Sequence, residues 1–167
     1  MKVLISVASK HGATGEIGDI LAAVLSAARI DVEQSQPQDV VSLDPYDAVI
    51  LGSAIYAGRW LEPARALGDR LASDLSARPV WLFSSGPLGD PPMPVAESPD
   101  ALSLSERIGA CEHRTLAGRL ERAELGFLER AITKAVRAPA GDFRDWVGIR
   151  NWAREIAASL TKEKVAA

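Results

Sequence analysis

The sequence predicts an α/β fold in which one parallel sheet carries helices on both faces. Apolar, strand-like segments alternate with amphipathic helical segments along most of the chain, a pattern typical of a doubly wound parallel sheet. The chain has 167 residues, 47% of them hydrophobic, which suits one domain with a sizeable core. No internal repeat or linker is visible, so we expect a single domain over residues 1–167.

The first third of the chain predicts a strand, a helix and two further strands. Lys2–Ala8 is an apolar, β-branched run, and apolar residues at helical spacing predict a helix from Thr14 to about Ala28. A short strand is expected near Ile30–Gln34. The strand at Asp47–Gly52 contains a continuous apolar run, as expected for a strand that is covered on both faces.

The middle of the chain predicts one helix and one strand. Leu61–Leu75 has an apolar face at helical spacing, and Pro63 falls in its first turn, where a missing N–H costs nothing. Val80–Ser84 predicts the fourth strand. Residues 86–99 contain many prolines and glycines, which disfavour regular structure there.

The last third predicts a helix around Ser103–Gly109, a short strand at about Arg114–Ala117, and a final helix after residues 141–145. Between them, Arg119–Gly141 places apolar residues at helical spacing and carries five positive and three negative charges. It predicts an extra amphipathic helical segment. This segment is either an ordinary helix packed on the sheet or an element that docks on a membrane surface or a partner.

Charge and cysteine content exclude several classes of function. The net charge of −3 and the pI of about 5.4 argue against nucleic acid as a partner, because binding to its phosphates needs a basic face. Cys111 is the single cysteine, so no internal disulfide is possible, and we expect a reducing, cytoplasmic location. No apolar stretch is long enough to span a membrane, so we expect any membrane contact to be peripheral, at the inner face.

A short polar loop between the first strand and the first helix is the most informative motif. A strand, a tight loop and a helix start place several backbone N–H groups and the positive end of a helix dipole around one anion. The loop is neither GxxxxGK[ST] nor GxGxxG, and its short, hydroxyl-rich form points to a mononucleotide phosphate, specifically that of FMN. The predicted phosphate contacts are Ser9, Lys10, His11, Gly12, Ala13 and Thr14.

Two further segments follow predicted strands, and ligands of open parallel sheets bind beyond the carboxyl ends of the strands. We expect both segments to hold the flavin ring. The segment after the third strand comprises Ser53, Ala54, Ile55, Tyr56, Ala57 and Gly58. The segment after the fourth strand comprises Ser85, Gly86, Pro87, Leu88 and Gly89.

The aromatic residues near these segments suggest different roles. Tyr56 either stacks on the flavin or caps the core, and we favour stacking. For Trp60, which we expect at a helix start, we favour the core. The Ala57–Gly58 peptide is our candidate for a carbonyl that turns toward the flavin N5, where one hydrogen bond would contribute about 1 kcal/mol.

The chain resembles the flavodoxin family over nearly its whole length. The family's phosphate loop reads Thr-x-Thr-Gly-x-Thr, and this sequence keeps the first hydroxyl at Ser9, the glycine at Gly12 and the last threonine at Thr14, with His11 at the middle hydroxyl. The family's flavin-stacking aromatic falls on Tyr56. The resemblance implies a flavodoxin-like five-stranded parallel sheet of order 2-1-3-4-5 and non-covalently bound FMN.

A narrower resemblance is to the menaquinone-dependent protoporphyrinogen oxidase branch of flavodoxin-like proteins. It rests on Gly52–Trp60, on Phe143–Trp146 and on Asn151–Ala157, and the extra segment at 119–141 falls where that branch has an insertion. The resemblance implies an FMN-dependent oxidoreductase that takes electrons from a reduced tetrapyrrole and passes them to a quinone. No catalytic acid, base or nucleophile is visible, and the cofactor would perform the chemistry.

Two alternatives remain at this stage. One is a soluble flavodoxin-type electron carrier whose partner is a redox protein, and the other is a flavin-free binding domain with the same fold. The spacing of His11, Cys111 and His113 fits no metal-ligand pattern, so we predict no metal site. The sequence leaves the oligomeric state open.

Overall fold

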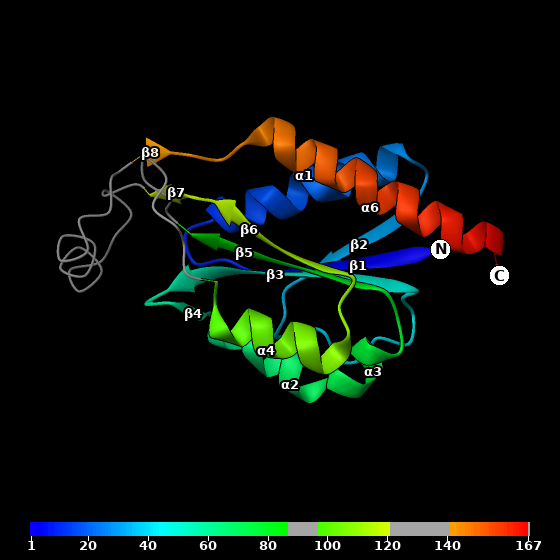
Figure 1. The fold of residues 1–167 in the computed structure, drawn as a ribbon, viewed down its shortest axis with the longest axis horizontal. Coiled ribbons are helices and arrows are strands. Elements are labelled where there is room, and N and C mark those ends of the chain that lie inside the picture. The colour runs from blue at the N-terminus through cyan, green and yellow to red at the C-terminus, as the bar shows by residue number, and fades with distance from the viewer. Residues whose placement is uncertain (87–96, 121–140, 167) are drawn as a thin grey trace.

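A parallel sheet separates two layers of helices in the computed structural model, which describes residues 1–86, 97–120 and 141–166 (Figure 1). Helices α1 (Ala13–Ala27) and α6 (Trp146–Ala166) cover one face of the sheet. The other face is covered by three shorter helices. These are α2 (Glu62–Arg70), α3 (Ala72–Ser76) and α4 (Pro99–Ile108).

The sheet has the strand order β2-β1-β3-β5-β6, with all neighbours along this path parallel. It confirms the predicted order of five parallel strands. A sixth, two-residue strand, β4 (Arg59–Trp60), pairs antiparallel with β3. The five parallel strands are β1 (Lys2–Ala8), β2 (Asp31–Ser35), β3 (Ala48–Tyr56), β5 (Val80–Gly86) and β6 (Glu112–Ala117).

Alternating side chains of the central strands build two apolar cores, one on each side of the sheet. In β5, Trp81 and Phe83 face α1 and α6, whereas Val80 and Leu82 face α2 and α4. Phe83 meets Trp152 of α6 edge to face, with ring centroids 6.1 Å apart. The neighbouring Gly52 must lack a side chain, since a Cβ there would lie 2.1 Å from the Phe83 ring.

Several predicted boundaries are wrong, and two of the errors affect the site. The third strand continues from Gly52 to Tyr56, and the fourth continues from Ser84 to Gly86. Both extensions pair with neighbouring strands, so their backbone groups are satisfied within the sheet. The predicted loop residues from Ser53 to Tyr56, together with Ser85 and Gly86, therefore lie in strands.

Other boundary errors concern helices. The single helix predicted at Leu61–Leu75 is two helices, α2 and α3, which are separated at Leu71. Helix α4 starts at Pro99, four residues before the predicted start, because proline suits a first helical turn. The final helix is confirmed as α6, and its Trp152 is fully buried in the core.

The ends of the predicted amphipathic segment form a small ladder of their own. Strands β7 (Arg119–Leu120) and β8 (Gly141–Asp142) pair antiparallel. A helical start at Arg119 is therefore wrong, and residues 121–140 lie outside the described residues.

Candidate functional site

The carboxyl ends of the central strands meet at one edge of the sheet, which we call the loop edge. The register aligns Ala8 of β1 with Ser53 of β3, and Ser53 with Ser84 of β5. Figure 1 shows this edge on the left, opposite the side where both chain ends lie. All described residues of the three predicted binding segments lie at or just beyond this edge, as the sequence predicts.

Residues 9–14, the phosphate loop, end in a helix start without a side-chain cap. Gly12 is the N-cap residue of α1 with a φ of +80°, a left-handed conformation that glycine adopts without strain. The first helical hydrogen bond runs from the Glu16 N–H to the Gly12 carbonyl. The N–H groups of residues 13–15 therefore have no acceptor within the helix, and they carry the positive end of its dipole.

The surroundings of the phosphate loop leave room for an anion. A Cβ at Gly12 would meet no atom within 4 Å. The Thr14 side chain is buried in the first turn of α1, whereas Ser9 and His11 are half-buried and Lys10 is exposed. Backbone donors, an open approach and nearby hydroxyls are what a phosphate group requires.

The end of β3, a two-residue turn and β4 form the 55–60 hairpin. Ile55 pairs with Trp60 and Tyr56 pairs with Arg59. Ala57 and Gly58 occupy the turn with φ of +48° and +77°, as a type I′ turn requires. The hairpin replaces the loop that the sequence predicts and places the Ala57–Gly58 peptide at its tip.

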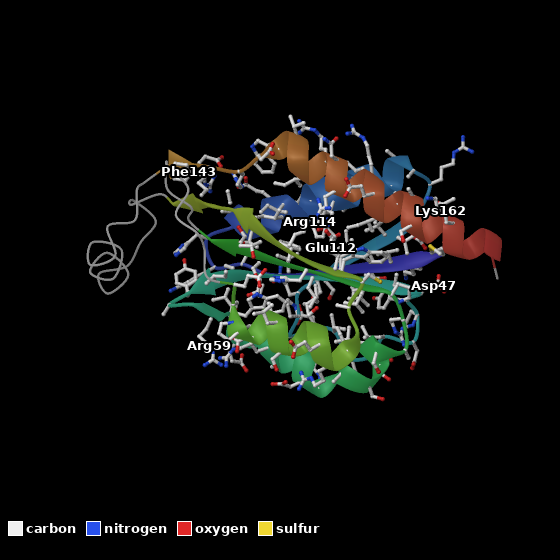
Figure 2. The ribbon with its side chains drawn as sticks, in the orientation of Figure 1. Asp47, Arg59, Glu112, Arg114, Phe143 and Lys162 are labelled. Atoms are coloured by element: carbon white, nitrogen blue, oxygen red, sulfur yellow. The ribbon has the colours of Figure 1, made fainter. Side chains whose placement is uncertain are left out.

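Side chains from three elements anchor the 55–60 hairpin, namely Asp100 of α4, Ser53 of β3 and Ser84 of β5. Asp100 of α4 accepts two hydrogen bonds from the Arg59 Nε and Nη2, at 2.8 and 2.7 Å, and one from the Trp60 backbone N–H at 3.0 Å. Figure 2 shows Arg59 beside the start of α4. The Ser53 Oγ accepts a hydrogen bond from the Leu61 N–H and donates one to the Ala54 carbonyl.

The two aromatic residues of the hairpin have different environments. Trp60 is 2% exposed and belongs to the core, which confirms the role we favoured. Tyr56 is half-buried and faces the phosphate loop. Its ring centroid lies 6.3 Å from that of His11 and 5.3 Å from the Lys10 Nζ. The phosphate loop and the hairpin tip thus lie side by side, as a flavin nucleotide would require.

The third predicted segment is described only in part. Ser85 and Gly86 end β5, and the Gly86 carbonyl accepts a hydrogen bond of 2.7 Å from the Gly118 N–H just after β6. A Cβ at Gly118 would lie 2.9 Å from that carbonyl oxygen, so the two strand ends approach closely. The predicted contacts Pro87, Leu88 and Gly89 lie outside the described residues.

A buried arginine supports the first turn of α1 from behind the phosphate loop. The Arg144 side chain is 2% exposed, and its guanidinium donates to Glu16 at 2.7 Å, to Asp142 at 2.6 Å and to the Ala13 carbonyl at 3.0 Å. It also lies 4.3 Å from the Trp146 ring centroid. The carboxylate partners raise the pKa of Arg144, and Arg144 lowers the pKa of Asp142 through hydrogen bonds and charge.

Our sequence reasoning missed the roles of Asp100 and Arg144. Asp100 follows a proline in the first turn of a helix, where an acidic residue is ordinary, and its partner Arg59 lies 41 residues away. Arg144 and Glu16 are 128 residues apart. Asp142, two residues before Arg144, is the one partner of this arginine that lies close to it in the sequence.

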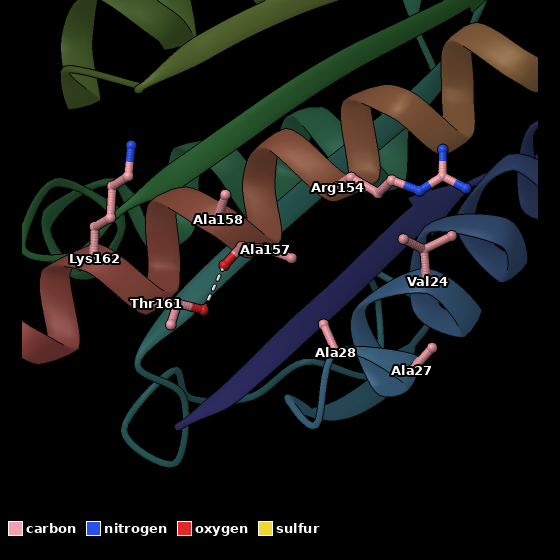
Figure 3. Close-up of a pocket in the computed structure, with 8 residues that line it drawn as sticks. All are labelled: Val24, Ala27, Ala28, Arg154, Ala157, Ala158, Thr161 and Lys162. Carbon is pink, nitrogen blue, oxygen red and sulfur yellow. Dashed lines mark hydrogen bonds between the residues drawn. The ribbon is translucent and has the colours of Figure 1, made fainter.

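Three further findings concern the rest of the described structure. A groove of about 840 Å³ lies between α1 and α6, lined mainly by alanines, Val24 and Thr161, with Arg154 and Lys162 beside it (Figure 3). Among the described residues, no helix is long and apolar enough to cross a membrane. The described part of the chain also contains no group of three or more His, Cys, Asp or Glu side chains that could hold a metal ion.

Comparison with known families decides the assignment. Residues 4–146, from β1 to the start of α6, match the family described as flavodoxin domain. The chain belongs to the flavodoxin domain family. A comparison with curated protein sequences gave no match.

Solved structures with the same fold include several flavodoxins. A cysteine-to-serine mutant of flavodoxin from Pseudomonas aeruginosa has 18% identity and a TM-score of 0.62, with 96% of this chain and 99% of that chain covered. Flavodoxin from Megasphaera elsdenii has 23% identity and a TM-score of 0.59, with 79% and 98% covered. At these identities the structures show the shared flavodoxin-like fold.

A larger protein contains the same fold. The rubredoxin oxygen:oxidoreductase from Desulfovibrio gigas matches at 15% identity with a TM-score of 0.67. The match covers 99% of this flavodoxin domain but 37% of that chain. This flavodoxin domain therefore corresponds to one part of that protein.

Proposed function

We propose that this flavodoxin domain binds FMN non-covalently at the loop edge and works as an electron carrier for a redox protein. The main support is the placement of the uncapped, glycine-led start of α1 beside the half-buried Tyr56. An anion site next to an aromatic surface suits the phosphate and the ring of a flavin mononucleotide. Membership of the flavodoxin domain family also supports FMN binding.

Each part of the site has a distinct task in this proposal. The backbone N–H groups at the start of α1 bind the phosphate, the Thr14 and Ser9 hydroxyls lie beside them, and Lys10 adds positive charge. Tyr56 stacks against the ring. Bound FMN supplies the hydride and electron chemistry, so the protein needs no acid, base or nucleophile of its own.

The hairpin turn has a further task in positioning. Ala57 carries only a methyl group and Gly58 carries no side chain, and both have a positive φ. The peptide between them therefore has little side-chain bulk to keep a flavin ring at a distance. Asp100, Ser53 and Ser84 fix the base of the hairpin, so the tip is the part of it that can adjust to a ligand.

Calorimetry and absorption spectroscopy of the purified protein test FMN binding. We expect saturable uptake of one FMN per chain and a perturbed flavin spectrum, with FMN bound more tightly than riboflavin because the phosphate contributes. If well-folded protein takes up no FMN, the proposal is wrong, and the flavin-free binding domain becomes the better description.

A second candidate is an FMN-dependent dehydrogenase that passes electrons from a reduced tetrapyrrole to a quinone. The named matches are flavodoxins and the rubredoxin oxygen:oxidoreductase, so the comparisons give this branch no specific support. The observation in its favour is the cation next to the ring site, since Lys10 lies against Tyr56. A positive charge there suits an anionic small substrate better than a basic protein partner.

Asp100 pairs with Arg59 and offsets its positive charge at the hairpin, so Arg59 does not repel a basic redox partner there. An anaerobic assay with FMN-loaded protein, protoporphyrinogen and menaquinone separates the two candidates. We expect no oxidation above a control without protein, whereas the FMN-loaded protein reduced with dithionite should pass electrons rapidly to an artificial one-electron acceptor. Protoporphyrinogen oxidation that depends on the protein would favour the dehydrogenase instead.

A further inference from the structure

A chain of hydrogen bonds in the core links the 55–60 hairpin to the sheet. The Trp60 Nε1–H donates to the Ser84 Oγ at 2.8 Å, and the Ser84 Oγ lies 2.9 Å from the His113 Nε2. Trp60 and Ser84 are 2% and 0% exposed, and His113 is half-buried. The chain crosses from β4 through β5 to β6 on the face that α2 and α4 cover.

The chemistry of these groups fixes the direction of one bond, and the tautomer of His113 sets the other. The indole N–H of Trp60 can only donate, so the Ser84 oxygen accepts from it. In the neutral Nδ1–H tautomer of His113, Nε2 carries a lone pair and accepts the Ser84 O–H. We assign this tautomer to the flavin-binding form.

Protonation of His113 would reverse one bond of the chain. The Nε2 atom would become a donor, and the buried Ser84 O–H would lose its acceptor. A buried polar group without a partner is costly, so the protonated state favours a rearrangement of Ser84 and of Trp60, which depends on it.

The charged groups around His113 favour its neutral form on balance. Burial lowers the pKa of His113 from its ordinary value of 6.5, and Glu97, which precedes α4, acts in the opposite direction more weakly. Of the α4 residues that face the sheet, Ala101, Leu104 and Ile108 are apolar, and Asp100 is paired with Arg59.

Other charges on β6 and α4 are directed to other partners. Arg114, on the opposite face of β6, is bonded to Glu112 and to Glu155 of α6. Figure 2 shows Glu112 and Arg114 on β6, beside α6. Arg107 of α4 pairs with Asp69. These groups do not offset the effect of burial on His113.

We propose that neutral His113 is a positioning residue that holds the 55–60 hairpin in its flavin-binding position through Ser84 and Trp60. Protonation of His113 then weakens flavin binding at acidic pH. The inference rests on the proposed function for its link to FMN, whereas the link from His113 to Trp60 can be measured without any flavin.

The first experiment uses the apo protein. The indole N–H resonance of Trp60, assigned by its loss in Trp60→Phe, is followed by NMR from pH 8 to pH 5 together with the His113 ring signals. We expect both to shift with one midpoint below 6.5. In His113→Gln the side-chain oxygen can still accept from Ser84 but does not titrate, so the Trp60 signal should not shift. A Trp60 signal that ignores the His113 titration overturns the inference.

The second experiment measures the FMN dissociation constant of wild type and His113→Gln at pH 8 and pH 5.5. The ratio of the two constants cancels the titration of the FMN phosphate and of every group that the two proteins share. We expect a ratio within about twofold at pH 8 and a wild type weakened by about fivefold relative to the variant at pH 5.5, the effect of one hydrogen bond. An equal ratio at both pH values rejects the positioning role.

A third variant separates positioning from folding. Ser84→Ala removes the middle group of the Trp60–Ser84–His113 hydrogen-bond series. We expect this variant to bind FMN more weakly than wild type at both pH values, with the same pH dependence as His113→Gln. Circular dichroism at each pH checks that all variants are folded. If no protein binds FMN, the proposed function fails, while the NMR experiment still decides whether His113 controls Trp60.

Discussion

The phosphate loop and the 55–60 hairpin lie side by side but are held in different ways. The phosphate loop ends in a glycine N-cap, and the groups that we propose bind an anion are backbone N–H groups at the start of α1. The hairpin is fixed by side chains, with Asp100, Ser53 and Ser84 bonded to its base. One end of the site thus depends on backbone conformation, and the other depends on particular side chains.

This difference predicts which substitutions the site should tolerate. A side chain in the phosphate loop can change without loss of the N–H groups, as His11 at a position where the resembled family has a hydroxyl illustrates. A side chain that anchors the hairpin cannot change so freely, because its loss leaves a backbone or indole N–H without an acceptor. Substitutions at the two ends should therefore differ in their effects.

Arg144 is the exception at the phosphate end, because a single side chain there holds the first turn of α1. Arg144→Met leaves Glu16 and Asp142 without their buried partner, and we expect the free energy of unfolding to fall by about 3 kcal/mol in urea titrations. Arg114→Met is the matched control, since Arg114 also bridges two carboxylates beside a tryptophan but its side chain is 34% exposed. A loss as large for Arg114→Met would show that burial is not the cause.

The same variant should change the response to acid. Arg144 lowers the pKa of Asp142, so the Asp142 contribution to stability is complete above its unfolded pKa and is lost as the pH falls through the lowered folded value. We therefore expect the stability of wild type to decline between those two values, and Arg144→Met to show a flatter decline. If the free energy of unfolding falls with the same slope in both proteins as the pH is lowered, this assignment is wrong.

Gly12→Val tests the backbone control of the phosphate loop. Gly12 has open space around it, so the cost comes from forcing a β-branched residue to a φ of +80°. We expect a loss of about 2 kcal/mol, divided between unfolding free energy and FMN affinity. Gly15→Ala is the control, because a Cβ there makes ordinary contact at 3.8 Å and alanine favours a helix. Wild-type stability and affinity in Gly12→Val would show that the loop does not need this conformation.

Asp100→Ala tests the side-chain control of the hairpin. It leaves the Trp60 N–H without its acceptor and breaks the bidentate pair with Arg59, so we expect a loss of about 1.5 kcal/mol in unfolding free energy and weaker FMN binding. In the control Asp69→Ala, the broken pair with Arg107 is exposed on both sides, and we expect about 0.5 kcal/mol or less. Equal effects of the two variants would mean that Asp100 does not anchor the hairpin.

His11→Ser should have the smallest effect. The backbone N–H groups of the phosphate loop remain in place, and the new hydroxyl restores the pattern of the resembled family. We expect the FMN dissociation constant to change by less than about threefold, equivalent to about 0.6 kcal/mol. A change beyond about tenfold, or about 1.4 kcal/mol, would show that this side chain, not only the backbone, determines binding at the phosphate end.

The sequence predicted the architecture well because its signals are local. Continuous apolar runs at Val80–Ser84 and within Asp47–Gly52 identified buried strands, and apolar spacing identified α1 and α6. The strand-loop-helix pattern identified the phosphate loop. Where strands end was less predictable, because Ser53–Tyr56 is strand through pairing with β1, β4 and β5.

What the sequence by itself determined is therefore the order of elements, the sheet with two helical layers, and the residues of the phosphate loop, since these follow from composition and periodicity over neighbouring positions. Only the tertiary structure decided how the site is supported. Asp100 meets Arg59, Arg144 meets Glu16 and Ser84 joins Trp60 to His113 across separations of 24 to 128 residues. Such pairs have no local signature, because burial and the direction of each hydrogen bond are properties of the folded chain.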